Sequence, residues 1–327
     1  MSIFVVLLNW NGWKDTVECL DSLFHSVSTN MVVVVCDNAS TDASLAHLEA
    51  WAAQHCGINE WAHLTRAEVE AGATLANVIR LAIVDNAVNL GFGGGSNVGI
   101  RLAMNHPACD YVWLLNNDTA VKPDALTQVW MRMEQDPAIG LCGSTLIYYH
   151  DRSKVQAFGG AHYYTLSGRS RLLGAFALSS QVPQNAHVVE AKLSFVVGAA
   201  MMVRRAFIEQ VGYLQDDYFL YFEEIDWATR GAELFRLGYA PNSIVYHKEG
   251  ASIGTQPSGG SALSLYYLYR NRVWFTCRFF PACLITVLVA CAWDILKMIV
   301  KGRREQASAA FRGVLSLSLP VDMVVGS

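Results

Sequence analysis

Polar side chains suited to binding sugars, phosphates and cations directly follow four apolar runs of this chain. The runs lie at residues 3–8, 31–36, 81–84 and 111–115, and their composition is typical of strands buried on both faces of a parallel sheet. The carboxyl ends of such strands meet at one edge, where ligands bind. The sequence therefore predicts a crevice lined by amides and carboxylates, which suits a sugar nucleotide better than an apolar ligand. The residues expected to line it are Asn9, Trp10, Asn11, Asp37, Asn38, Asn89, Asn116, Asn117 and Asp118.

Asp118 is the carboxylate best placed to hold a metal ion. It stands just after an apolar strand, in the sequence LLNNDT. Mg²⁺ and Mn²⁺ prefer oxygen ligands and bridge diphosphate oxygens, so a cation here would neutralise charge on a departing nucleoside diphosphate. An Asx turn before Pro123 explains the same residue equally well.

A second acidic cluster consists of Glu223, Glu224 and Asp226, and the aromatic sequence YFLYF precedes it. A carboxylate beside aromatic rings loses hydration, which raises its pKa and makes it a better general base. Arg230 follows Asp226 at helix-pair spacing and can orient it. The alternative is that these acids only stabilise the start of a helix, where the helix dipole favours negative charge.

The glycine-rich stretch at residues 91–95 offers a competing interpretation. It has the G-x-G-x-x spacing of a dinucleotide fingerprint, but Ser96 follows it and it does not lie on the first strand. An oxidoreductase would also need an acid after a following strand, and Asp110 precedes its strand. A flexible loop, or a backbone surface that lets a nucleotide approach closely, is the alternative. A non-catalytic nucleotide- or glycan-binding protein is a third possibility.

Strands and helices alternate along most of the chain, which predicts an α/β fold with a mostly parallel sheet and helices on both faces. Residues 55–80 are expected to be a helical insertion broken at Gly57 and Gly72. Other helices are expected at residues 15–27, 43–54 and 123–135, from the glycine-rich stretch to about residue 106, and from near Phe222 onward. Further strands are expected at residues 140–149 and 195–205, and another is expected to end near His247. Residues 150–190 show no clear pattern of either kind.

The composition narrows the class of protein. The 327 residues are 53% hydrophobic and 16% charged with a net charge of −4, which excludes a disordered chain and a globally basic nucleic-acid binder. The eight cysteines form no C-x-x-C pair, so neither a disulfide framework nor a zinc site is expected. The apolar run at 3–8 lacks a basic leader and indicates a buried strand rather than a signal peptide. We therefore expect a cytoplasmic protein.

The C-terminal part has a different character. Residues 266–304 contain a single acid, Asp294, and residues 279–293 are 15 uncharged residues, fewer than a membrane-spanning helix needs. A helical unit at 266–327 that lies on an anionic membrane surface is expected, after a catalytic domain at 1–265. A core helix with ordinary surface lysines is the alternative. The basic residues of the segment are Arg270, Arg272, Arg278, Lys297, Lys301, Arg303 and Arg304.

Seven motifs, in order, carry a resemblance to a known family: VVLLNWNG, VVVVCDNASTD, NLGFGGGSNVGI, VWLLNNDT, FVVGAAMMVRR, YFLYFEEIDWATR and VYHKEG. Over roughly residues 3–275 the chain resembles family 2 glycosyltransferases, and within them the bacterial rhamnosyltransferase-like group. The resemblance implies a GT-A fold, inversion at the anomeric carbon and a divalent metal, Mg²⁺ or Mn²⁺. It also implies a dTDP- or UDP-sugar donor, with rhamnose expected, and a lipid-linked or cell-surface glycan acceptor at the inner face of the membrane.

The resemblance also implies roles for individual residues. Glu224 matches the catalytic base, although that position is usually Asp, and Glu223 and Asp226 stand beside it as further catalytic candidates. Asp37 is expected to contact the nucleobase. Asn116 stands where a stricter D-x-D motif has a carboxylate, which predicts a weaker metal site. The expected metal group is Asp118, Asn116 and His247, and the expected nucleotide-sugar contacts are Asn9, Trp10, Asn11, Asp37, Asn38, Asn89, Gly91, Asn97 and Asn117.

Overall fold

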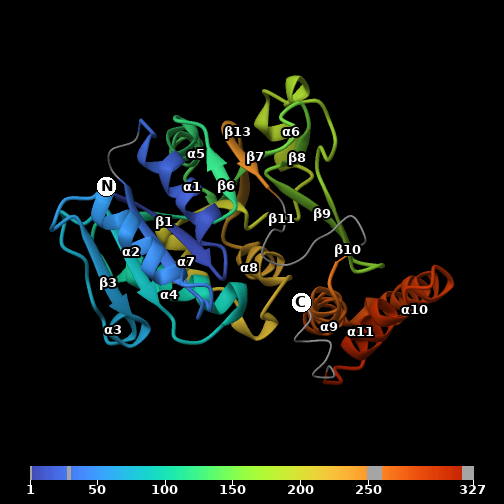
Figure 1. Ribbon diagram of the computed structural model, residues 1–327. Helices are drawn as coiled ribbons and strands as arrows, with labels where there is room; N and C mark the ends of the chain where they lie inside the picture. The colour runs from blue at the N-terminus through green and yellow to red at the C-terminus, as the bar shows by residue number, and fades with distance from the viewer. Residues whose placement is uncertain (1, 28–30, 249–259, 319–327) are drawn as a thin grey trace.

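A computed structural model describes residues 2–27, 31–248 and 260–318 of the chain (Figure 1). A large sheet with helices on both sides occupies the N-terminal part. Of the three helices at the C-terminal end, the first packs beside this part and the other two extend away from it. Residues 249–259 of the expected catalytic domain, and residues 319–327 of the expected C-terminal unit, lie outside the described residues.

The first half of the chain forms the following elements: β1 (Ser2–Asn9), α1 (Trp13–Phe24), β2 (Met31–Asp37), α2 (Ser44–His55), β3 (Trp61–Thr65), α3 (Arg66–Glu70), β4 (Leu81–Asp85), α4 (Gly91–Asn105), β5 (Cys109–Asn116), β6 (Thr119–Val121), α5 (Ala125–Gln135) and β7 (Ile139–Tyr148).

The second half forms β8 (Val155–Phe158), β9 (Gly160–Tyr164), β10 (Arg169–Leu172), α6 (Ala186–Glu190), β11 (Phe195–Val196), β12 (Ala200–Arg204), α7 (Arg205–Val211), α8 (Glu223–Gly231), β13 (Arg236–His247), α9 (Ala262–Phe279), α10 (Leu284–Val300) and α11 (Arg304–Val314), with 3-10 turns at Ser179–Gln181, Asp216–Tyr218 and Pro281–Cys283.

The central sheet runs in the order β3-β4-β2-β1-β5-β12-β7-β13-β6, and β8 also pairs with β7. The strands from β3 to β5 in this order are mutually parallel, whereas β12 lies antiparallel between β5 and β7. A smaller sheet has the order β10-β9-β11. This mixed, mostly parallel sheet with helices on both faces confirms the predicted α/β architecture.

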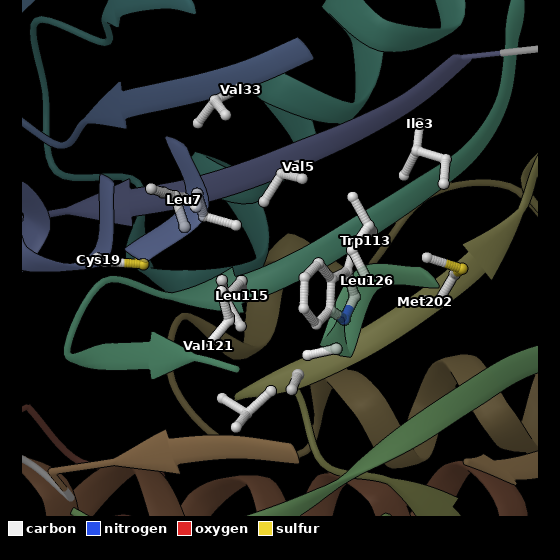
Figure 2. Packing of buried hydrophobic residues seen from close by; sticks show 14 of the residues in the cluster. Ile3, Val5, Leu7, Cys19, Val33, Trp113, Leu115, Val121, Leu126 and Met202 are labelled. Atoms are coloured by element: carbon white, nitrogen blue, oxygen red, sulfur yellow. The ribbon is translucent and has the colours of Figure 1, made fainter. Parts of the chain in front are cut away.

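The strands are apolar throughout because each face of the sheet is covered. Ile3, Val5 and Leu7 of β1 face a core that includes α1, α2 and α5 (Figure 2). Phe4 and Val6 point to the opposite side, where they pack with residues of α4, α7 and α8. This alternation fixes the register of β1, and therefore the place where Asn9 emerges at its end.

The prediction of a helical insertion at residues 55–80 is wrong. The segment supplies β3, which pairs in parallel with β4 at the edge of the sheet, and only the short helix α3 follows. Trp61 packs against the core on one face and Leu64 against the core on the other. Pairing with β4 satisfies the backbone of this segment, and the local sequence contains no signal for that distant partner.

The glycine-rich stretch is the first turn of α4 and not an open loop. Gly91 has a φ of +71°, and a Cβ atom there would lie 2.2 Å from the Phe219 carbonyl oxygen. A Cβ atom on Gly95 would lie 2.5 Å from Leu8 Cδ1. These glycines therefore let the helix approach β1 and the segment before α8 closely. Their packing accounts for the G-x-G spacing without a dinucleotide.

The helix that contains the apolar segment extends beyond the uncharged run. α10 continues through Asp294 to Val300, and Asp294 forms ion pairs with Arg272 (3.2 Å) and Arg169. The segment Pro281–Val300 has 20 residues, a mean hydropathy of 2.2 and only 11% of its residues buried. By length and composition this helix could cross a membrane.

Candidate active site

The parallel register brings the predicted polar strand ends together. Asn9 at the end of β1 pairs with Asp37 at the end of β2, and Leu8 pairs with Asn116 at the end of β5. Asp37 in turn pairs with Asp85 at the end of β4. The four strand ends therefore share one edge of the sheet, as expected for a ligand-binding crevice of an α/β fold.

Asn9 and Asp37 form a buried network beneath this edge. Asn9 Nδ2 donates to Asp37 Oδ1 (2.7 Å), and the Ser40 hydroxyl donates to the same oxygen (2.6 Å). Both Asn9 and Asp37 have an exposed fraction of 0%. Thr16 Oγ1 donates to Asn9 Oδ1 (2.7 Å) and accepts from Asn117 Nδ2 (3.0 Å), which extends the network to β5. That Asp37 contacts the nucleobase stays a prediction.

The outer part of the edge is more accessible. Trp10 is half-buried and Asn11 is exposed in a left-handed conformation, and its Oδ1 accepts from Thr41 N (2.7 Å). Asn38 Nδ2 donates to Asn89 Oδ1 (3.1 Å) and to the Gly91 carbonyl (3.0 Å), so these residues fix the start of α4.

Asn97 has a different position from the one its predicted role suggests. Its Nδ2 donates to the Leu214 carbonyl (2.8 Å) and its Oδ1 accepts from Leu214 N (3.1 Å). The side chain is buried. Its carboxamide thus ties α4 to the segment before α8 and serves the backbone there.

Asp118, Asn116 and His247 come together as predicted. His247 Nε2 lies 3.1 Å from Asp118 Oδ1 and 3.3 Å from Asn116 Nδ2, and the Asp118 and His247 side chains are nearly buried. On its other side, His247 Nδ1 lies 2.8 Å from Gln156 Oε1. Gln156 was not predicted, because it belongs to the mixed region at 150–190 and only the fold brings it to β13.

This arrangement fits a divalent cation. His247 Nε2 and Asp118 Oδ1 lie 3.1 Å apart, a spacing that suits a shared proton. With Nε2 unprotonated, the same two atoms could hold a metal ion. No group of three or more His, Cys, Asp or Glu side chains with metal-binding geometry occurs among residues 2–27, 31–248 and 260–318. Mg²⁺ is commonly held by one or two carboxylates together with substrate phosphates, and Asp118 can supply one such carboxylate.

Glu224 is linked to the same strand end by two consecutive backbone groups. Gly198 N donates to Glu224 Oε1 (3.2 Å), and the Ala199 carbonyl accepts from Asn116 N (3.0 Å). A Cβ atom on Gly198 would lie 2.7 Å from Glu224 Oε1, so a larger residue here would displace the Glu224 carboxyl. The connection between β11 and β12 therefore joins the predicted base to the predicted metal motif. Gly198 was not predicted; its only signal is that it interrupts an apolar run.

Burial raises the pKa of the Glu224 carboxyl, as the aromatic surroundings predicted, and the Gly198 N–H partly opposes this shift. Glu223 is fully buried, and its pKa is raised well above the ordinary value, first by burial and then by the charge of Glu224. No other residue of the described chain donates a hydrogen bond to either Glu223 oxygen. Glu224 thus keeps a partner for its ionised form, whereas no hydrogen-bond donor of another residue in the described chain favours the ionised form of Glu223.

Asp226 is unsuited to the catalytic role that was predicted for it. Its carboxylate is fully buried and pairs with Arg230 Nε (2.6 Å) and Arg278 Nη1 (3.0 Å), and the Tyr218 hydroxyl donates to it (3.1 Å). The Arg230 pair was expected from helix spacing. Arg278 comes from α9, so Asp226 joins α8 to the C-terminal helices.

The segment that precedes α8 is strained. Phe219, Tyr221 and Phe222 have φ values of +65°, +67° and +79°, and Phe222 is the N-cap of α8. Each such residue costs about 1–3 kcal/mol unless the surroundings impose the conformation. The strained turn, defined as residues 217–222, leads directly to Glu224.

The Glu223→Met variant should be more stable than the wild type, and increasingly so as the pH rises. Above the ordinary pKa of 4.5 the folded state binds more protons at Glu223 than the unfolded chain does, so the free energy of unfolding falls with rising pH. Methionine keeps the length of the side chain without an unpartnered carboxyl group. Melting temperatures between pH 5 and pH 8 measure this. A variant less stable than the wild type at pH 8 would show that the Glu223 carboxylate has a favourable partner.

Sequence comparisons link this chain to glycosyltransferases. The family model for "Glycosyl transferase family 2" matches residues 2–212. The low-salt glycan biosynthesis hexosyltransferase Agl10 of Haloferax volcanii is 21% identical over 240 residues, which are 71% of this chain and 74% of that protein.

Solved structures show the fold. The mannosyltransferase PcManGT of Pyrobaculum calidifontis, in complex with GDP-Man and Mn²⁺, has a TM-score of 0.56 at 14% identity, covering 99% of this chain and 78% of its own. TarS 1-349 of S. aureus, in complex with UDP-GlcNAc, also has a TM-score of 0.56 at 14% identity, covering 96% and 82%. The chain therefore has a GT-A-like fold, as its sequence motifs implied.

Proposed function

Because this chain belongs to glycosyl transferase family 2, we propose that it transfers a sugar from a nucleoside diphosphate to a hydroxyl group, with inversion at the anomeric carbon. The observation that carries this proposal is the backbone link at residues 198–199. It holds the Glu224 carboxyl beside the strand end at which Asp118 and His247 meet. In this proposal one bound donor contacts all three side chains.

Asp118 and His247 would hold a divalent cation, with Asn116 beside them. When bound, Mg²⁺ or Mn²⁺ supplies positive charge to the leaving diphosphate. The exposed Asn11 and the half-buried Trp10 are available to the nucleoside at the same edge of the sheet.

Glu224 is the general base in this proposal. Its carboxylate takes the proton of the acceptor hydroxyl while the acceptor oxygen forms a bond to C1 of the sugar. The bond between C1 and the diphosphate oxygen breaks, and its electron pair leaves with the nucleoside diphosphate. A single displacement of this kind inverts the configuration at C1. The raised pKa makes the Glu224 carboxylate a stronger base. Only the ionised form of Glu224 can take the proton.

The donor sugar is proposed to be a hexose or 6-deoxyhexose, with dTDP-rhamnose first among the candidates because of the rhamnosyltransferase-like motifs. Agl10 is a hexosyltransferase of glycan biosynthesis, and the two structures hold GDP-Man and UDP-GlcNAc, so these donors belong in the same panel. A lipid-linked or cell-surface glycan is the proposed acceptor.

Thermal shifts with dTDP-rhamnose, UDP-GlcNAc, GDP-mannose and NADH, each with and without Mn²⁺, test the proposal. We expect stabilisation by one nucleotide sugar that depends on Mn²⁺, together with slow release of its nucleoside diphosphate when water is the acceptor. Stabilisation by NADH alone would favour the oxidoreductase alternative. Donor binding without release, in the presence of glycan acceptors, would favour a non-catalytic binding protein.

The C-terminal helices are proposed to hold the enzyme on the cytoplasmic face of the cell membrane. The apolar stripe of α10, defined as Ile285, Val289, Trp293, Leu296 and Val300, has helical spacing and is exposed along its whole length. Lys297 lies 5.2 Å from the Trp293 ring centroid, and Lys301, Arg303 and Arg304 follow the stripe. An anionic bilayer complements both the apolar area and the charge.

The double variant Val289→Glu/Trp293→Glu should bind phosphatidylglycerol-containing vesicles at least roughly tenfold more weakly than the wild type, because two exposed apolar side chains that would enter the bilayer become charged. Vesicle flotation measures this. Ile58→Glu is the matched control, since Ile58 is 95% exposed and lies away from the C-terminal helices. Unchanged binding of the double variant, or cell-membrane attachment that resists carbonate, would contradict peripheral docking through this stripe.

A further inference from the structure

We propose that Asn271 and Arg270, two neighbouring residues of α9, are positioning residues that hold the strained turn and thereby place Glu224. This inference rests on the proposed role of Glu224 and adds a function for the C-terminal helices beyond membrane attachment. Figure 1 shows α9 next to α8, with α10 and α11 extending away from the sheet.

Asn271 donates hydrogen bonds to the backbone of the strained turn. Its Nδ2 lies 2.9 Å from the Tyr218 carbonyl oxygen, 2.7 Å from that of Leu220 and 3.0 Å from that of Tyr221. Asn271 has an exposed fraction of 0%. Three carbonyls that converge on one buried amide group need a donor at this point, because a buried carbonyl without a partner is costly.

Arg270 completes the clamp from the more accessible side. Its Nη2 donates to the carbonyls of Asp217 and Tyr218, both at 2.8 Å, and its Nε donates to Asn271 Oδ1 (2.9 Å). The guanidinium lies over the rings of Tyr267 (4.7 Å) and Trp274 (4.3 Å). The amide of Asn271 is therefore oriented by Arg270, and the guanidinium of Arg270 is fixed by its aromatic neighbours.

The opposite side of the turn faces the first turn of α4. The Phe219 carbonyl accepts from Phe92 N (2.7 Å), and Gly91 lies directly against the Phe219 backbone. α9 adds side-chain contacts as well: Phe275 packs with Phe222, and Arg278 pairs with Asp226 on α8. The strained turn is thus held between α4 and α9.

These contacts set the position of the proposed base. Phe222 is both the last residue of the strained turn and the N-cap of α8, and Glu224 lies in the first turn of that helix. If the turn relaxed, the start of α8 would move and the Glu224 carboxyl would leave the Gly198 N–H. A misplacement of about 1 Å can lower a rate by about 10²-fold.

The test uses the full-length protein and nucleoside diphosphate release from the donor that gives the largest Mn²⁺-dependent thermal shift. In the Asn271→Asp variant, a carboxylate of the same shape replaces the amide group, and this carboxylate can accept hydrogen bonds but not donate them. We expect kcat per folded molecule to fall on the order of 10²-fold, with the Kd for the nucleoside diphosphate within about threefold of the wild type. The acid limb of the kcat–pH profile should also shift, since the surroundings of Glu224 change.

Asn105→Asp is the matched control. Asn105, at the far end of α4, likewise donates to two backbone carbonyls, those of Val69 and Ala73 (3.3 and 3.1 Å). It should lower the melting temperature without changing kcat or the pH profile. If both variants behaved alike, with kcat per folded molecule and pH profile unchanged, Asn271 would be merely structural and the inference would be overturned.

Arg270 provides a second test if Asn271→Asp fails to fold. Arg270→Met keeps the aliphatic part of the side chain but loses the hydrogen bonds to the carbonyls, so kcat should fall roughly tenfold. Arg270→Lys provides one donor group again and should recover part of the lost kcat. Equal kcat in these two variants and the wild type would overturn the inference. Failure of this inference can be distinguished from failure of the proposed function. If the proposed function were wrong, the Glu224→Gln variant would also retain turnover.

Discussion

Glu224→Gln is expected to lower sugar transfer by about 10²-fold or more while donor binding persists. Glutamine keeps the shape of the side chain and can still accept from the Gly198 N–H, but it cannot take a proton from the acceptor hydroxyl. In the wild type, kcat/KM should rise with pH through a pKa above the ordinary value of 4.5, since burial raises the pKa of Glu224. The variant should lack this acid limb. Nucleoside diphosphate release against pH, with donor affinity from calorimetry, measures both effects.

Glu233→Gln serves as the matched control, because Glu233 is exposed just after α8. It should leave turnover and its pH dependence unchanged. Near-wild-type turnover in Glu224→Gln would reject Glu224 as the base. A loss of turnover confined instead to Glu223→Met would assign the role of the base to Glu223.

Asp118→Ala is expected to abolish the dependence of donor binding on a divalent cation. It removes the carboxylate that faces His247 Nε2 at 3.1 Å. Loss of residues that only support a metal ligand lowers affinity or activity about 10–100-fold, so loss of the ligand itself should cost at least about 100-fold in donor affinity with Mn²⁺. Calorimetric titration of the donor with Mn²⁺ and with EDTA measures the change.

Asp110→Ala tests whether the effect is specific to this end of the sheet. Asp110 lies at the opposite end of β5 and accepts from Ser2 N (3.2 Å), and it was the acid considered for the oxidoreductase alternative. Donor affinity should be unchanged in this control. Equal affinities of wild type and Asp118→Ala, with and without EDTA, would show that Asp118 holds no metal needed for the donor.

Local sequence was sufficient to predict the strand ends. Apolar runs that stop at Asn9, Asp37 and Asn116 reveal strands covered on both faces, and parallel pairing then brings their ends to one edge. The proximity of Asp118 and His247 followed from family resemblance rather than from periodicity, because 129 positions along the chain separate them and only the fold joins them.

The rest depends on partners that are remote in sequence. Asp226 looked like a catalytic acid from its helix, but Arg278 of α9 neutralises it. Gly198 matters because its N–H contacts Glu224. The strand β3 depends on pairing with β4, which the local sequence does not reveal. Asn271 had no distinguishing pattern, since one polar residue in an aromatic helix does not reveal the carbonyls it meets. Such contacts are decided by packing, which hydrophobic periodicity does not specify.

The most direct test is the anomalous diffraction signal of Mn²⁺ in crystals of the full-length protein grown with the nucleotide sugar that gives the largest thermal shift. We expect the manganese between Asp118 and His247 Nε2, in contact with the diphosphate, and the Glu224 carboxyl on the far side of the sugar from that diphosphate. Manganese bound elsewhere, or a sugar whose C1 lies beyond the reach of Glu224, would contradict a single site built from these residues.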